Sequence, residues 1–120
     1  MKTNIKKVNS VSCAVVHSEE IIISDAQTAL DFIATVRYET NCDRVSLNKE
    51  AISENFFNLS TGLAGEILQK FVNYRMKLAI IGDFSKYTSK PLKDFIYECN
   101  LGNSIFFVAT EQSALEKLAG

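Results

Sequence analysis

The chain has 120 residues, of which 47% are hydrophobic and 22% are charged, and its formal net charge is −1. This length and composition predict one compact domain over residues 1–120 with one sizeable core. The near-neutral charge and dispersed lysines exclude a long-range field that would gather nucleic acid, and no apolar run approaches the roughly 20 residues that cross a membrane.

The N-terminal part predicts a β-hairpin. The first stretch, MKTNIKKVNS, lacks the apolar region of a secretion signal, so we expect a cytoplasmic protein. Two short, partly alternating segments at about residues 3 to 9 and 11 to 17 meet at Asn9 and Ser10. Polar turn residues between two such segments are typical of antiparallel strands.

A helix and a strand are expected next. Ser24 and Gln27 have the spacing of a capping box, and apolar side chains then recur at helical spacing until about Tyr38. After the polar turn ETNCD, Val45 and Leu47 indicate a strand with alternating exposure.

The stretch NLSTGLAGEILQKF predicts a helix that begins with unusual residues. Phe56 and Phe57 precede it, and because they are adjacent we expect one in the core and the other over a neighbouring loop. From about Ser60 an apolar stripe indicates a helix with Gly62 and Gly65 in its opening turns. Glycine in a helix costs about 1 kcal/mol relative to alanine. We therefore expect a close approach by a neighbouring strand or a partner at these glycines.

The C-terminal half alternates strands with helices. Continuous apolar runs at about residues 77 to 82 and 104 to 109 predict two central, parallel strands. Between them, Ser89 is placed to cap a helix that Gly102 would end in a left-handed conformation, and Thr110 is placed to cap a last helix.

This order of elements predicts the fold class. It is α/β, a mixed sheet of order ββαβαβαβα with parallel central strands, an antiparallel hairpin at one edge and helices packed on the sheet. No linker or repeat divides the chain.

Metal and cofactor chemistry is not expected. Cys13, Cys42 and Cys99 share no close spacing and are accompanied by one histidine, His17, whereas zinc sites usually show paired ligands a few residues apart. Cys13 and Cys99 fit apolar patterns and are expected in the core, and Cys42, between polar neighbours, is expected at the surface.

Two resemblances accompany these patterns. LSTGL at residues 59 to 63 resembles the Asp-Ser-Ser-Gly-Leu helix start of STAS domains in bacterial anti-anti-sigma factors and sulfate-transporter tails, although Leu59 replaces the acidic residue. IFFVATEQSALEKLAG resembles the last strand and helix of that fold. STGLAGEILQKFVNYRMKLAIIGDFSKYTSKPLKDFIYECNLGNSIFFV resembles the bacterial family called domain of unknown function 4180, and this likeness spans nearly the whole chain. The STAS resemblance implies a regulatory or protein-interaction module.

The candidate site lies where parallel strands end. Loops that leave the carboxyl ends of such strands gather at one edge, so NLSTG and GDFSKYTSK should lie together. The candidate ligand- or partner-binding residues are Ser60, Thr61, Gly62, Asp83, Ser85, Lys86, Tyr87, Ser89 and Lys90. Free helix-start amides and lysines favour a small anion. The alternative is that the hydroxyl groups only cap helices, Asp83 makes a turn and the lysines are solvated.

Three function classes follow. The first is a non-enzymatic regulatory or interaction module that binds a protein partner or a second copy, with Phe84 and Tyr87 as candidate anchors, although Phe84 also fits the core. The second is a small-anion or nucleotide sensor. The third, a hydrolase, ranks last because Asp83 and Ser85 have no histidine nearby and no Gly-x-Ser-x-Gly, Walker or GxGxxG motif is present.

Overall fold

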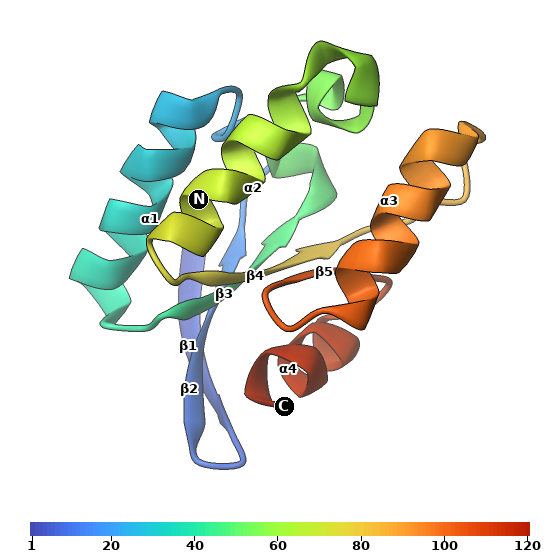
Figure 1. Cartoon of the computed structure of the whole chain (residues 1–120). Coiled ribbons are helices and arrows are strands. Elements are labelled where there is room, and N and C mark those ends of the chain that lie inside the picture. Colours follow the sequence, from blue (N-terminus) through green and yellow to red (C-terminus); the bar gives the residue numbers. More distant parts are fainter.

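The computed structural model describes residues 1–120 and contains one five-stranded sheet with the spatial order β1-β2-β3-β4-β5 (Figure 1). Its strands are β1 (Lys2–Val8), β2 (Val11–His17), β3 (Arg44–Asn48), β4 (Lys77–Ile81) and β5 (Ile105–Val108). Strands β1 and β2 pair antiparallel, and β2 to β5 pair in parallel. The hairpin and the mixed sheet confirm the predicted fold class.

The helices follow the predicted order. They are α1 (Ala26–Thr40), α2 (Leu63–Asn73), α3 (Lys90–Leu101) and α4 (Glu111–Ala119), and three 3-10 turns precede α2: η1 (Lys49–Ala51), η2 (Glu54–Phe57) and η3 (Leu59–Thr61). None of these helices combines the length and the apolar character needed to span a bilayer.

The sheet is covered unequally on its two faces. Helices α1 and α2 lie side by side and, with α3, bury the main core of 24 residues, whereas α4 alone covers the opposite face with a cluster of five (Figure 1). Successive strand residues point to opposite faces, so Leu78 and Ile80 enter the main core and Ala79 lies under α4. Strand β5 is parallel to β4 as predicted but lies at the sheet edge, because no later strand pairs with it.

Three burial predictions are wrong or incomplete. Strand β3 is buried on both faces, since β2 and β4 flank it and α4 covers its second face, so even Ser46 is inaccessible. Cys42 is 4% exposed, because the left-handed Asn41 turns the chain back under α1. Phe56 and Phe57 are both buried, although Phe57 does cover a loop, as described below.

Helix ends differ from the predictions in detail. Asp25, one residue after Ser24, caps α1, because its Oδ1 accepts from the Thr28 amide at 2.8 Å while Thr28 Oγ1 accepts from the Asp25 amide at 3.0 Å. Ser89 caps α3 and Thr110 caps α4 as predicted. Gly102 is extended, with φ −87° and ψ −164°, and does not adopt the predicted left-handed conformation.

The glycines of the second helix have a different explanation from the predicted close approach. The α-helix begins at Leu63, and Gly62 joins η3 to it with φ +76°, a left-handed conformation that glycine adopts at little cost. A Cβ at Gly62 or Gly65 would meet no atom within 4 Å, so no neighbouring strand approaches either. The close approach occurs at Gly82, where a Cβ would lie 2.7 Å from Lys49 Cβ.

Candidate functional site

The two predicted loops leave the same edge of the sheet. Strands β3 and β4 are in parallel register up to Asn48 and Ile81, so η1 to η3 and the loop at residues 82–89 begin side by side. The loop contacts η2, one turn before the predicted Ser60 segment. We call this side of the molecule the carboxyl edge.

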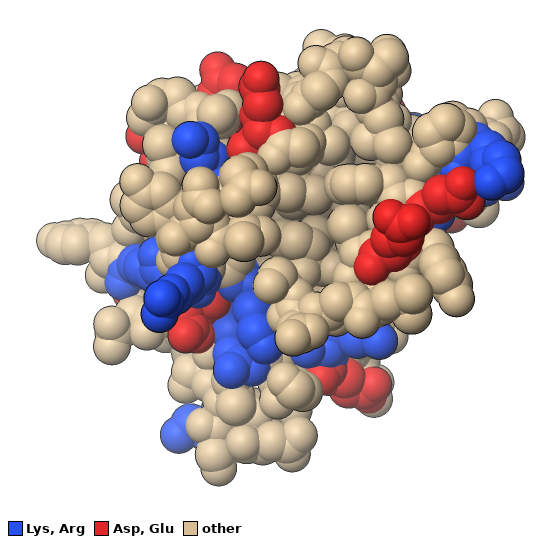
Figure 2. Space-filling view, viewed as in Figure 1, with Lys and Arg blue, Asp and Glu red and all other residues tan.

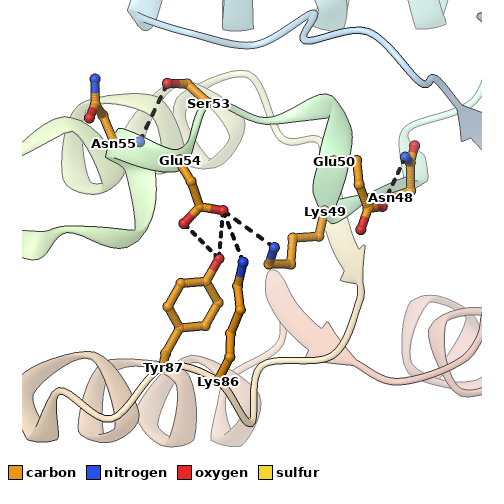
Figure 3. Close-up of polar contacts among 8 residues, drawn as sticks. All are labelled: Asn48, Lys49, Glu50, Ser53, Glu54, Asn55, Lys86 and Tyr87. Carbon is orange, nitrogen blue, oxygen red and sulfur yellow. Dashed lines mark hydrogen bonds and ion pairs between the residues drawn. The ribbon is translucent and has the colours of Figure 1, made fainter.

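A polar network joins the loop to η2, and Glu54 is its centre (Figure 3). The Tyr87 hydroxyl lies 2.9 Å from both Glu54 carboxylate oxygens. The ammonium groups of Lys49 and Lys86 lie 3.4 and 3.6 Å from Glu54 Oε1. Three donors from two separate segments therefore converge on one carboxylate.

Lys49 is the least exposed member of this network, with 7% of its surface accessible. Its Nζ lies 5.6 Å from the ring centroid of Phe57 and 5.3 Å from that of Tyr87. The stem of Lys49 passes directly over Gly82, which has no side chain to obstruct it. A buried ammonium is costly without partners, and here the two rings and Glu54 provide them.

Aromatic contacts hold the loop against the core. Tyr87 stacks on Phe57 with centroids 5.0 Å apart and an interplanar angle of 19°. The ring centroid of Phe84 lies 6.0 Å from that of Phe57 and 5.4 Å from that of Phe107 in β5. Phe84 therefore packs into the core, which is the alternative to an exposed anchor that its sequence allowed. Tyr87 is half-buried.

The network shifts the acid–base behaviour of its members. Burial raises the pKa of Glu54, but the Tyr87 hydrogen bond and the charges of Lys49 and Lys86 outweigh it, and the pKa lies below its usual range. Burial, together with the neighbouring Glu54 carboxylate, raises the pKa of Tyr87 well above its usual value. At neutral pH the pair is therefore a carboxylate and a neutral phenol.

Ser60 and Thr61 hydrogen-bond within their own segment. Ser60 Oγ donates to Asn58 Oδ1 at 2.7 Å, and Thr61 Oγ1 donates to the Asn58 carbonyl at 2.9 Å. Thr61 Oγ1 also accepts from the Leu63 amide at 3.2 Å. These contacts shape the turn that leads through Gly62 into α2.

The remaining predicted residues form the loop and the start of α3. Asp83 Oδ1 accepts a hydrogen bond from the Ser85 amide at 2.9 Å. Hydrogen bonding from Ser85 lowers the pKa of Asp83. Ser89 Oγ accepts from the Leu92 amide at 3.4 Å, and Lys90 pairs with Asp94 at 2.7 Å. These contacts agree with the capping and turn alternative.

No group of His, Cys, Asp and Glu side chains in the chain has an arrangement suited to a metal ion. Burial raises the pKa of the Cys13 and Cys99 thiols, which disfavours the reactive thiolate. His17 is exposed at the end of β2. The carboxyl edge contains hydrogen-bonding and ionic groups but no paired nucleophile and base.

Lys49 and Glu54 are site residues that the sequence predictions missed. Their stretch, NKEAISENFF, folds into 3-10 turns and shows neither helical nor strand periodicity. A usable signal was present, because Lys49 directly follows a parallel strand, where side chains reach the carboxyl edge.

The order of strands and the uneven helix layers define a mixed α/β protein, and the polar network at the carboxyl edge holds its loop at residues 82–89 against η2. The family model for "Domain of unknown function (DUF4180)" matches residues 8–118, and the chain belongs to this family, as the sequence resemblance predicted. No curated protein matches the chain. Among solved structures, one of the anti-sigma factor antagonist SpoIIAA in its unphosphorylated form is similar, with 12% identity, 99% of each chain covered and a TM-score of 0.44.

Proposed function

We propose that this protein is a non-enzymatic regulatory module that binds a protein partner through its carboxyl edge. The binding surface consists of the exposed polar residues of η3, of the loop at residues 82–89 and of the first turn of α3. The single observation that carries the proposal is the convergence of Lys49, Lys86 and Tyr87 on Glu54, because it fixes the loop against η2.

A fixed loop favours binding. Ordering a mobile segment costs free energy at the moment of association, and the contacts of Phe57 and Tyr87 supply this order in the free protein. Ser85 and Lys86 remain exposed on the outer side of the loop and are available to a partner. The loop therefore presents accessible polar groups on a backbone that packing already orders.

A protein partner is favoured over a small anion by the charges. Lys86 and Lys90, the two cations proposed for an anion, already have carboxylate partners, Glu54 and Asp94. A phosphate would need to displace these carboxylates. A protein partner can instead contact the neutral and the charged side chains of the proposed binding surface at the same time.

The proposal is tested by quantitative capture of partners from a lysate of the source organism. The purified full chain is compared with Lys86→Glu, which reverses a charge on the proposed surface. Lys7→Glu is the matched control, because Lys7 is exposed on β1 and pairs with Ser12, at the end of the hairpin away from the carboxyl edge. We expect a partner that is retained by the parent and by Lys7→Glu and reduced at least about tenfold by Lys86→Glu.

Two results would count against the proposal. The first is equal recovery of every captured protein by both variants, and the second is release of product from a small substrate by the parent that Lys86→Glu abolishes. Circular dichroism of each variant establishes that it is folded before capture.

A further inference from the structure

The opposite edge of the sheet, where β3 and β4 begin and α1 and α2 end, carries a second distinctive surface. Three hollows of about 470, 200 and 480 Å³ lie along it. The first is lined by Arg37 and Arg44, the second by Arg75 and Lys77, and the third by Lys77 and Lys117. We call this surface the amino edge. Figure 2 shows Lys and Arg side chains gathered in a band between α2 and α4.

Positive charge is in excess at the amino edge. The lining of its hollows includes the five basic side chains named above and two acidic side chains, Asp43 and Glu116. Asp43 lies 3.6 Å from Arg44, and no carboxylate pairs with Arg75 or Lys77. The surface is therefore incompletely neutralised by the chain's own acids, although the whole chain has a net charge of −1.

The side chains of two of these cations, Arg37 and Arg44, are held by backbone carbonyls. The Arg37 guanidinium donates to the Tyr74 carbonyl, and that of Arg44 donates to the Leu118 carbonyl. Arg75 has φ +56°, a left-handed conformation in which glycine or asparagine is usual. Arginine offers five donors, so the guanidinium groups keep free N–H groups for a ligand.

Apolar surface accompanies this charge. The middle hollow is also lined by Phe71, Val72 and Met76. Val72 is 48% exposed and Tyr74 is 51% exposed. Tyrosine and arginine beside an apolar hollow are the residue types that dominate protein–protein binding energy.

We propose that the amino edge binds an acidic polypeptide segment that also carries apolar side chains. Its carboxylates pair with Arg75 and Lys77, while an apolar side chain enters the hollow of Phe71, Val72 and Met76. A polypeptide is favoured over nucleic acid because apolar side chains line the hollow beside Arg75 and Lys77, and a phosphate backbone has no apolar group to place there.

The test uses fluorescence anisotropy with labelled peptides of defined composition. The first probe is a decapeptide of alternating Glu and Leu, the second is deca-glutamate, and the third is a ten-nucleotide single-stranded DNA, each at about 50 mM salt, where surface electrostatics are strong. The double variant Arg75→Glu/Lys77→Glu reverses the central charges. The control, Lys2→Glu/Lys93→Glu, makes the same net change at exposed residues away from the amino edge.

We expect the parent to bind the Glu/Leu peptide at least about fivefold more tightly than deca-glutamate, because the leucines reach the apolar hollow. The variant at Arg75 and Lys77 should raise the Kd of this peptide at least about tenfold, and the control should leave it within about twofold. Loss of binding in both variants, or none in the parent, would overturn the proposal. Tighter binding of the DNA would make the surface a nucleic-acid site. Since these probes act at the opposite edge from the loop, the result is independent of the proposed function.

Discussion

Replacing Gly82 by alanine tests whether the carboxyl edge is packed around the Lys49 side chain. The new Cβ would lie 2.7 Å from Lys49 Cβ and 2.9 Å from Lys49 Cδ, closer than folded proteins allow. Lys49 has little room to move, because Phe57 and Tyr87 flank it and Glu54 holds its ammonium group. Overpacking typically costs about 1–3 kcal/mol, and a clash with a Cβ that is tied to the backbone places this case at about 2–3 kcal/mol.

Urea unfolding followed by circular dichroism measures this loss, and thermal unfolding should show a fall in Tm of about 6–15 °C for a domain of this size. Gly65→Ala is the matched control, since a Cβ there meets nothing within 4 Å and alanine favours the helix by about 0.5–1 kcal/mol. The two substitutions should therefore shift stability in opposite directions. If Gly82→Ala unfolds at the parent's urea concentration, the packing described around Lys49 is wrong.

Further predictions concern the network, the buried hydroxyl and the thiols. Glu54→Gln should lower the free energy of unfolding by about 0.5–1.5 kcal/mol in urea titrations. The value is modest because this carboxylate is largely exposed. An unchanged urea midpoint would show that Lys49 needs no counter-charge. The folded state lowers the pKa of Glu54, so the carboxylate stabilises the fold fully above its unfolded pKa of about 4.3, and this stabilisation is lost as pH falls through the lower folded pKa. The difference in the free energy of unfolding between the parent and Glu54→Gln should therefore shrink in acid. Ser46→Ala should leave stability unchanged or raise it by up to about 1 kcal/mol, because the Ser46 hydroxyl is buried without a partner, and a loss above about 1 kcal/mol would reveal a missing hydrogen bond. Cys13 and Cys99 should react with iodoacetamide more slowly in the folded chain than in urea, as their raised pKa values require, and equal rates would contradict the burial of Cys13 and the partial burial of Cys99.

The sequence was sufficient for the order of elements because each strand or helix carries its own pattern. The runs KLAII and SIFFV are apolar on both faces, and Ser89 and Thr110 stand at helix starts, so local chemistry and tertiary structure agree. The position of β5 at the edge was not predictable in this way. It depends on which strands are left without a neighbour, and this is a property of the whole sheet.

Burial near turns was the least predictable feature. Cys42 lies between polar residues, yet the left-handed Asn41 folds it beneath α1. Lys49 has a residue type that is usually exposed, and its burial depends on Gly82, which is 33 residues further along the chain, leaving room for its stem. Local periodicity contains no information about such long-range contacts. The rule that loops gather at the carboxyl ends of parallel strands could have included this lysine, because it applies to every residue that follows a strand.

The most direct test of the central claim is site-specific photo-crosslinking from the loop. A benzoylphenylalanine residue at Ser85, which is exposed on the proposed surface, is compared with the same residue at Ala34, which is exposed on α1. In a lysate of the source organism, irradiation should give one discrete higher-mass adduct from position 85, which Lys86→Glu weakens, and no such adduct from position 34. Identical products from both positions, or none from position 85, would contradict the assignment of the carboxyl edge as a protein-binding surface.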